Sequence, residues 1–283
     1  MAPRTREEAL SDPSGTNAAI DRVVHYGKEA PLIEPAPDDT VRLPGGLVRG
    51  GSLVRTATVR ELNGSDEEAL SRALKSGSAY RFMDTLIECG TVSVGGVKAD
   101  QSTLKGLLAG DRDELALAIR RVTYGEEMDI ERWVCPACGK QSDISFTLTD
   151  DVIDRKTLGP DGGVFEIALR KGAKARVRFP TGADQDALFA DEDWTAAQRN
   201  TVLISRCVMS YTDPAGQEFN MAAFPSMSRT MSIPDRQTII REITERQPGP
   251  RYNEVKFRHD ECGNEVILAL GVTDLFRDLI RFL

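Results

Sequence analysis

Three of the five cysteines and one of the two histidines stand in two short segments with the same spacing. One segment is Cys-Pro-Ala-Cys-Gly and the other is His-Asp-Glu-Cys-Gly. The glycine after each cysteine can adopt the positive φ that closes such a turn without a Cβ clash. Neither segment completes a tetrahedral site alone, but together they offer a Cys₃His set that suits structural zinc. The predicted ligands of one zinc ion per chain are Cys135, Cys138, His259 and Cys262.

The donor set argues against catalysis at this metal, because a catalytic zinc keeps an open position for water or substrate. His259 begins the His-x-Glu pattern of zinc deaminases, but it follows the cysteine pair and no Pro-Cys-x-x-Cys is present. Cys135 and Cys138 could instead form a redox dithiol, although Gly139 and the second segment fit a metal better. The chain also lacks a phosphate-binding loop and a nucleophile elbow. We therefore predict that it is not an enzyme, with zinc hydrolysis by a three-ligand site as the least improbable enzymatic form.

The two ligand segments are the C-terminal ends of the two copies of a longer sequence repeat. An offset of 124 residues places Cys135 on His259, and further upstream the offset becomes 118. Two constant offsets with one length change are typical of a duplicated unit, and a unit of about 120 residues is of domain size. The main matched pairs are Arg60 with Arg178, Gly64 with Gly182, Asp66 with Asp184, Cys89 with Cys207, Asp111 with Asp235, Arg112 with Arg236, Gly125 with Gly249 and Cys138 with Cys262.

The repeat predicts an α+β fold of two similar duplicated lobes. Each lobe has a β-hairpin, helices and a zinc knuckle, and a shared zinc-ribbon-like site joins them. Residues 1–39 form an extended N-terminal arm, either a flexible tail or a segment that orders against a neighbouring subunit. Residues 40–149 form the first lobe, 150–163 a glycine-rich linker and 164–283 the second lobe. The amphipathic end of the second lobe is expected to pack on that lobe, with docking on a partner as the alternative.

Local signals place the helices around the site. Ser65 with Glu68 predicts a capping box, and Asp111 predicts the cap of a helix that Gly125 ends. Cys89 and Cys207 are expected to be buried core thiols rather than nucleophiles. Strands on both sides of the first knuckle would give the outline of a zinc ribbon.

Composition is that of a soluble globular protein, with 40% hydrophobic and 28% charged residues. The net charge of −8 argues against a broad nucleic-acid surface, which needs clustered Lys and Arg. No window reaches the ~18 apolar residues of a membrane span, and the N-terminus lacks the apolar core of a secretion signal. An odd number of cysteines, most of them in the knuckles, indicates a reduced, cytoplasmic setting with a metal.

Four segments carry a resemblance to a known family: Val41–Gly46, Val59–Glu68, Gly110–Asp113 and Cys135–Gly139. In this order they resemble the T-even-type baseplate hub assembly family of contractile-tailed phages and related injection particles, over roughly residues 40–270. The resemblance implies a role in building or forming the baseplate at the end of the tail tube, as a hub assembly chaperone or as a structural component. It also implies other tail or baseplate proteins as partners. The chain would then act in the cytoplasm of the producing cell during assembly or in the assembled tail particle.

Two functions of different class follow. The first is a non-enzymatic baseplate or tail-assembly protein clamped by zinc. The alternative is a zinc-ribbon binding module for nucleic acid or a regulatory protein. The acidic net charge and the low aromatic content of 6% favour the first.

Overall fold

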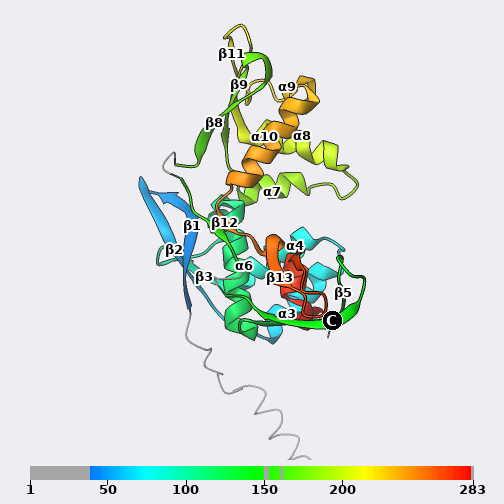
Figure 1. Cartoon of the computed structure of the whole chain (residues 1–283). Coiled ribbons are helices and arrows are strands. Elements are labelled where there is room, and N and C mark those ends of the chain that lie inside the picture. Colours follow the sequence, from blue (N-terminus) through cyan, green and yellow to red (C-terminus); the bar gives the residue numbers. More distant parts are fainter. Residues whose placement is uncertain (1–38, 150–152, 160–161, 282–283) are drawn as a thin grey trace, which may run out of the picture. The chain divides into compact units, whose positions relative to one another are not determined.

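The computed structural model describes residues 39–149, 153–159 and 162–281 (Figure 1), all of which belong to one compact unit. The predicted arm over residues 1–39 lies outside the described residues except for Asp39, and so does part of the predicted linker. The described chain is a mixed α+β protein with several small antiparallel sheets, which confirms the α+β part of the predicted fold class.

The first sheet has four antiparallel strands in the order β1-β2-β3-β4. Its inward face carries buried Val, Leu and Ala side chains, and Gly50 and Gly51 take positive φ in the turn that joins β1 to β2. The predicted hairpin is thus confirmed. The bounds are β1 Asp39–Arg49, β2 Ser52–Val59, β3 Thr91–Val94 and β4 Val97–Lys98, with α3 Gly64–Leu74 and α4 Ala79–Gly90 between β2 and β3, and α5 Gln101–Gly106 and α6 Ala109–Tyr124 after β4.

The second sheet has the order β11-β10-β9-β8, so its strands again follow one another in chain order. Two helices again separate its second and third strands, and two more follow its fourth strand. The bounds are β8 Val164–Ala168, β9 Lys174–Arg178, β10 Val208–Thr212 and β11 Glu218–Asn220, with α7 Gly182–Leu188, α8 Ala196–Cys207, α9 Met227–Thr230 and α10 Ile233–Arg246.

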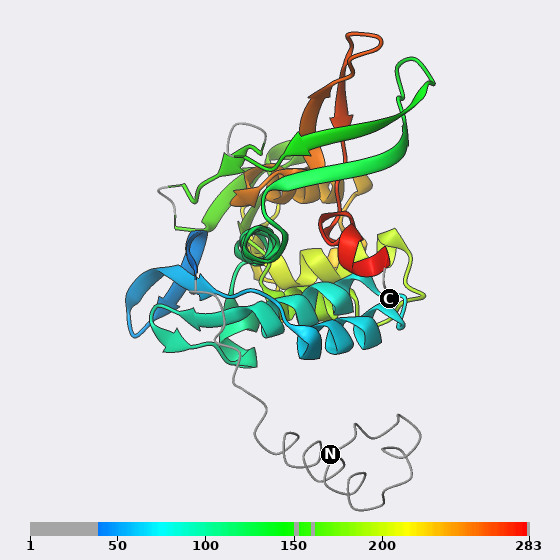
Figure 2. The same ribbon diagram turned by 90° about the horizontal axis from the view of Figure 1, so that it is seen from below.

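Two further hairpins carry the ligand segments. One pairs β5 Glu127–Val134 with β6 Gln141–Thr147, and the other pairs β13 Val255–Arg258 with β14 Glu265–Leu268. A short ladder of β7 Arg155–Lys156 with β12 Gly249–Pro250 precedes the second hairpin, and α11 Val272–Leu275 and α12 Arg277–Arg281 follow it. Figure 2, which looks along α6, shows the first sheet on one side of this helix and the two hairpins with the ligand segments on another.

The C-terminal helices do not pack where their amphipathic pattern led us to expect. The structure has two apolar cores, one centred on the first sheet and one on the second. Leu275, Phe276 and Leu279 belong to the first core, and the ring of Phe276 lies 6.1 Å from that of Phe82. The expectation that the C-terminal segment packs on its own lobe is therefore wrong, because the chain after β12 crosses to the first core. The amphipathic pattern fixed an apolar stripe but not the surface that covers it.

Two predicted caps also differ from the structure. Helix α3 begins two residues earlier than expected, with Asn63 as its N-cap and Asp66 closing the capping box. Asp111 lies inside α6 rather than at its cap, and its carboxylate accepts hydrogen bonds from the backbone N–H groups of Gly45 and Gly46 at 2.6 and 2.9 Å. These two N–H groups are free because the β1–β2 register shifts between Arg42 and Leu47. From the neighbouring helix, Asp111 thus provides the hydrogen-bond acceptor for the backbone N–H groups that a bulge in β1 leaves unpaired.

An ion pair between an arginine and an aspartate lies at the N-terminus of the first helix in each half. Arg60 donates two hydrogen bonds to Asp66 at 2.8 and 2.9 Å, and Arg178 donates two to Asp184 at 2.6 and 3.0 Å. Arg206 donates a third hydrogen bond to Asp184 from its guanidinium group. Burial alone would raise the pKa of Asp184, but these donors outweigh it and hold the pKa at about 2.

We expect Asp184→Asn to lower the free energy of unfolding by about 1–3 kcal/mol near neutral pH, because the charged partner of two arginines is lost. The folded pKa lies below the ordinary value of 3.8, so the stability that Asp184 contributes is present above pH 4 and is lost as the pH falls toward 2. Urea unfolding of both proteins between pH 3 and pH 7 measures this, and the difference between them should begin to shrink below pH 4.

Glu166→Gln is the matched control, since Glu166 pairs with Lys174 in an exposed position. Its effect should stay within about 0.5 kcal/mol at every pH. A difference between wild type and Asp184→Asn that does not change with pH would contradict the assignment of the stability to the ionised carboxylate.

Candidate metal centre

The structure brings the four predicted ligands together. The ligand atoms of Cys135, Cys138, His259 and Cys262 all lie within 4.8 Å of one another. The Sγ atoms of Cys135 and Cys262 are 4.0 Å apart, and Nδ1 of His259 lies 3.6 Å from Sγ of Cys138 and 3.3 Å from Sγ of Cys262. A tetrahedron with ordinary zinc bond lengths has edges of about 3.8 Å between two sulfurs and about 3.5 Å between sulfur and nitrogen. The cluster therefore has the size and the donor atoms to hold one metal ion.

Both ligand segments adopt the same turn. Gly139 and Gly263 take φ values of 72° and 69°, which confirms the positive φ expected for these glycines. In the first turn the N–H of Gly139 donates to the carbonyl of Cys135 at 2.8 Å, and in the second the N–H of Gly263 donates to the carbonyl of His259 at 2.7 Å. A second backbone hydrogen bond, to residue Lys140 or Asn264, closes each loop. The turn thus points the two ligands of each segment to one side.

Neighbouring side chains fix the orientation of His259. Its Nε2 lies 3.1 Å from the hydroxyl oxygen of Ser142, which leaves Nδ1 facing the cysteines. Trp133 packs edge-on to the imidazole with the ring centroids 5.5 Å apart. Such outer partners orient metal-binding histidines and tune their affinity. Lys140 and Glu261, 2.9 Å apart, add an ion pair between the two turns.

The cluster is covered on one side and open on the other. Cys135 and His259 are buried, Cys262 is half-buried and Cys138 is exposed. Burial alone would raise the pKa of the Cys135 thiol, but the backbone N–H groups of Cys138 and Ala137 lower it, which favours the thiolate that a metal needs. An ion held by all four groups would have no vacant coordination position.

The two remaining cysteines differ from these. Cys207 is buried as expected, whereas Cys89 is half-buried, which corrects that expectation. Desolvation by burial raises the pKa of Cys89 to about 11 and that of Cys207 to about 12. Nearby carboxylates, Asp66 and Asp184, act in the same direction. Both thiols are therefore protonated at neutral pH and are poor nucleophiles.

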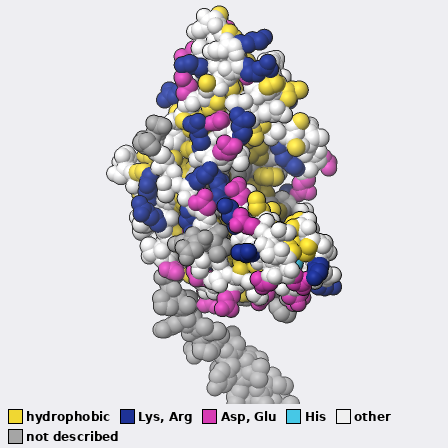
Figure 3. Space-filling model, viewed as in Figure 1, with side chains coloured by type: hydrophobic (Ala, Val, Ile, Leu, Met, Phe, Trp, Pro, Cys, Tyr) yellow, Lys and Arg dark blue, Asp and Glu magenta, His cyan; other side chains and the backbone are white. Residues whose placement is uncertain are grey.

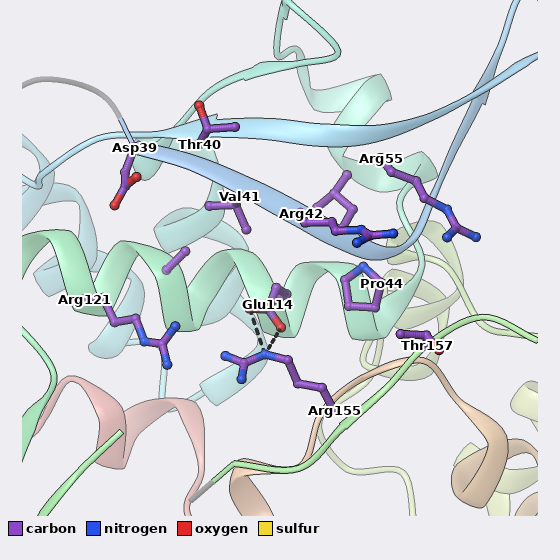
Figure 4. A pocket seen from close by; sticks show the side chains of 12 residues that line it. Asp39, Thr40, Val41, Arg42, Pro44, Arg55, Glu114, Arg121, Arg155 and Thr157 are labelled. Carbon is purple, nitrogen blue, oxygen red and sulfur yellow. Dashed lines mark hydrogen bonds and ion pairs between the residues drawn. The ribbon is translucent and has the colours of Figure 1, made fainter. Parts of the chain in front are cut away.

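A separate pocket of about 370 Å³ lies beside β1, and sequence reasoning missed it (Figure 4). Its arginines come from four distant positions in the sequence, so no local motif could have indicated it. Arg155 donates from Nε to both carboxylate oxygens of Glu114 at 2.9 and 3.2 Å, while Arg42 and Arg55 line the other wall. Its lining residues include no histidine, cysteine or serine, and its central carboxylate is already engaged in this ion pair.

The fold and the cluster define an α+β protein with a Cys₃His centre made by two hairpins. Residues 47–277 match the family model described as T4 bacteriophage base plate protein. The match covers most of the chain, so the protein belongs to this family, and the resemblance seen in the sequence is confirmed. No curated protein and no solved structure matches the chain.

Membership makes the protein a phage base plate component, and it implies contacts with other proteins of the tail or base plate. In the described part of the chain, every helix is too short or too polar to cross a membrane.

We expect elemental analysis of the metal-replete protein to find one equivalent of metal per chain, because the two segments build one site. Cys135→Ser removes a buried ligand and should reduce the metal content well below one equivalent. Cys89→Ser is the matched control and should retain the metal, because Cys89 lies outside the cluster. Two equivalents, or none, in the wild-type protein would contradict a shared site.

Proposed function

We propose that the protein is a non-enzymatic baseplate or tail-assembly protein of a contractile phage tail or injection system, acting as a hub assembly chaperone or as a structural component, and that one structural zinc stabilises it. The family match over residues 47–277 is the observation that carries this proposal. The closed ligand set supports the absence of catalysis, because four protein ligands leave no position for substrate. In the pocket beside β1, the carboxylate of Glu114 is already paired with Arg155.

Zinc is the metal that the donor set favours. Three thiolates and one imidazole are soft and borderline ligands, which suit zinc and disfavour magnesium or calcium. Three of the ligand separations are 3.3–4.0 Å, near the edges of a zinc tetrahedron, and none exceeds 4.8 Å. Because the ligands come from positions far apart in the chain, the binding free energy of the metal would contribute directly to folding.

We propose further that the two halves arose by internal duplication and form similar lobes. The order of strands and helices is the same in both, and several matched side chains make equivalent contacts. Arg60 and Arg178, 118 residues apart, each hold an aspartate of the following helix and also donate to the carbonyl of the next residue.

The offset of 124 gives a second set of matched contacts. Arg112 donates to the carbonyl of Leu104, and Arg236 donates to the carbonyl of Ser228, which lies 124 residues further on. Asp111 and Asp235 both accept a backbone N–H from the first hairpin of their half. Equal contacts at two constant offsets support descent from one unit. An experimental structure in which β1–β4 cannot be superposed on β8–β11 with Asp66 on Asp184 would overturn the duplication.

The division into a first lobe over 40–149, a linker over 150–163 and a second lobe over 164–283 stays a prediction. The packing of Phe276 suggests one amendment to it: the chain after β12 belongs with the first core. The lobes would then exchange their ends, with the second zinc knuckle and the C-terminal helices lying on the first lobe. Limited proteolysis, in which fragments that remain associated are separated by denaturation, tests this arrangement.

The alternative function, a zinc-ribbon module for nucleic acid or a regulatory protein, has less support. The net charge is −8, and on the face drawn in Figure 3 the Lys and Arg side chains lie among Asp and Glu side chains. Binding of phosphates needs a basic surface without such competition. We propose that the partners are tail or baseplate proteins, without nucleic acid or membrane.

The test of the proposed function is co-expression with the tail tube and hub proteins of the same phage, followed by affinity purification. Tail or hub proteins should co-purify, and nuclease treatment should leave their recovery unchanged. Loss of all partners on nuclease treatment would favour the alternative. Purified tail particles separate the two roles: a structural component is present in them, whereas a chaperone stays in the cytoplasm of the producing cell.

We expect Cys262→Ser to weaken this co-purification without abolishing the helical signal. Each half keeps its own apolar core, whereas the metal closes a long loop between the two hairpins. Proteolysis near Gly159 and Gly163 should become faster, and circular dichroism should change little. Cys89→Ser provides the control, and wholesale loss of helix in Cys262→Ser would show that the two cores depend on the metal.

A further inference from the structure

Among the contacts between the two halves of the chain, one has a well-defined backbone geometry. The loop between α5 and α6 receives the N-terminus of α7: the N–H of Gly182 donates to the carbonyl of Leu107 at 3.0 Å, and the N–H of Ala109 donates to the carbonyl of Pro180 at 2.9 Å. Lys105 lies 2.6 Å from a carboxylate oxygen of Asp186. We call residues 105–109 the receiving loop and residues 180–186 the inserting segment.

Gly182 allows this close approach. A Cβ atom at this position would lie 2.5 Å from Nη1 of Arg112 and 3.0 Å from the Cα atom of Lys105. Any side chain would therefore push the inserting segment out of the receiving loop.

If the halves are duplicates, each of them carries both sides of this contact. The counterpart of the receiving loop is residues 229–233, and the counterpart of the inserting segment is residues 62–68. The central positions keep their residue types. The receiving loop has a basic residue, and the inserting segment has an acidic residue and a glycine that begins its helix. The matched pairs are Lys105 with Arg229, Leu107 with Met231, Asp186 with Glu68 and Gly182 with Gly64.

Both counterparts have exposed residues at the contact positions, although Leu62 and Met231 are half-buried against the cores. Ile233 is 71% exposed, Arg229 is exposed, and the side chain of Glu68 is 77% exposed. A Cβ atom added to Gly64 would meet no atom within 4 Å, in contrast to Gly182. Among the described residues, Glu68 is paired only with Arg72 of its own helix, at 3.9 Å and in an exposed position. The first half therefore presents an accessible inserting segment, and the second half presents an accessible receiving loop.

We infer that the protein associates head to tail with further copies of itself, the receiving loop at 229–233 of one copy taking the inserting segment at 62–68 of the next. This inference depends on the duplication proposed above. Arg229 would pair with Glu68 across the contact, as Lys105 pairs with Asp186 within the chain. Such a contact joins two different surfaces, so a pair of copies leaves one of each free and further copies add until a ring closes or a filament grows.

The contact between copies is weaker than the contact within the chain. Tyr80 stacks on Phe189 with the ring centroids 5.1 Å apart, and Lys105 also pairs with Asp84. The counterparts of Tyr80, Asp84 and Phe189 are Gln198, Val202 and Ser71, which form neither contact. Association should therefore be reversible, dependent on concentration and sensitive to salt.

Sedimentation equilibrium of the full-length, metal-replete chain over a hundredfold range of concentration tests the inference. The wild type should show a mass that rises with concentration. Glu68→Arg and Arg229→Glu should each weaken association at least tenfold, because like charges then face each other. The double variant Glu68→Arg/Arg229→Glu should regain association, since the pair is restored with its signs exchanged.

Two further variants exclude simpler explanations. Gly64→Val should block association while leaving the melting temperature of the single chain nearly unchanged, because the position faces open space within the chain. Glu218→Arg, an equal change of charge on β11, should associate as the wild type does. A monomer at every concentration, or association that none of the contact variants alters, would overturn the inference. Neither result would affect co-purification with tail proteins, so the proposed function stands or falls separately.

Discussion

The rest of the structure depends on one buried helix that carries charges. In α6, Asp111 and Arg112 are fully buried, Arg120 is 2% exposed and Glu114 is 6% exposed. Each is engaged from a different direction: Asp111 by the bulge of β1, Arg112 by Asp84 of α4, Glu114 by Arg155, and Arg120 by the carbonyls of Gly125 and Glu127. Leaving any one of these buried charges unpaired costs several kcal/mol, on the order of 3–5 for a broken buried pair. The helix therefore fixes the elements around it in one arrangement.

The same helix explains why the metal ligands meet. Its C-terminal end leads directly into β5 and the first ligand segment. At its other end, Gly110 lets the returning chain cross closely, since a Cβ atom there would lie 1.5 Å from the carbonyl oxygen of Pro248. Tyr252 then donates a hydrogen bond to Asp113 at 2.8 Å, and β13 follows with the second ligand segment. The crossing brings together two hairpins that are more than a hundred residues apart in the sequence.

Sequence reasoning predicted what local chemistry determines. The spacing in each ligand segment, with Gly139 and Gly263 at positive φ, fixes a turn of few residues, and the Gly50–Gly51 turn is equally local. Sequence reasoning failed where the structure depends on a choice between partners that are distant in the sequence. The C-terminal segment around Phe276 carries an apolar stripe that either core could cover. The carboxylate of Asp111 could accept hydrogen bonds either from the N-terminus of its own helix or from the β1 bulge. The bulge decides the second case, because its freed N–H groups are buried and need an acceptor. The pocket beside β1 depends on tertiary structure alone, since its arginines share no motif.

The two halves keep their internal contacts alike but differ in what they offer to each other. Asp66 and Asp184 each accept hydrogen bonds from the arginine before their helix. The ion pair at the start of the first helix is therefore the same in the different surroundings of the two halves. By contrast, the fully buried Arg112 reaches Asp84 and approaches Gly182, whereas Arg236 is half-buried and bonds to Thr201 within its own half. A duplicated unit that folds by local pairs can change its outer contacts without losing its core, because the two sets of interactions involve different atoms. That separation leaves one half with the Cys₃His cluster and the C-terminal helices packed on it, while the other keeps the surface that corresponds to the receiving loop exposed.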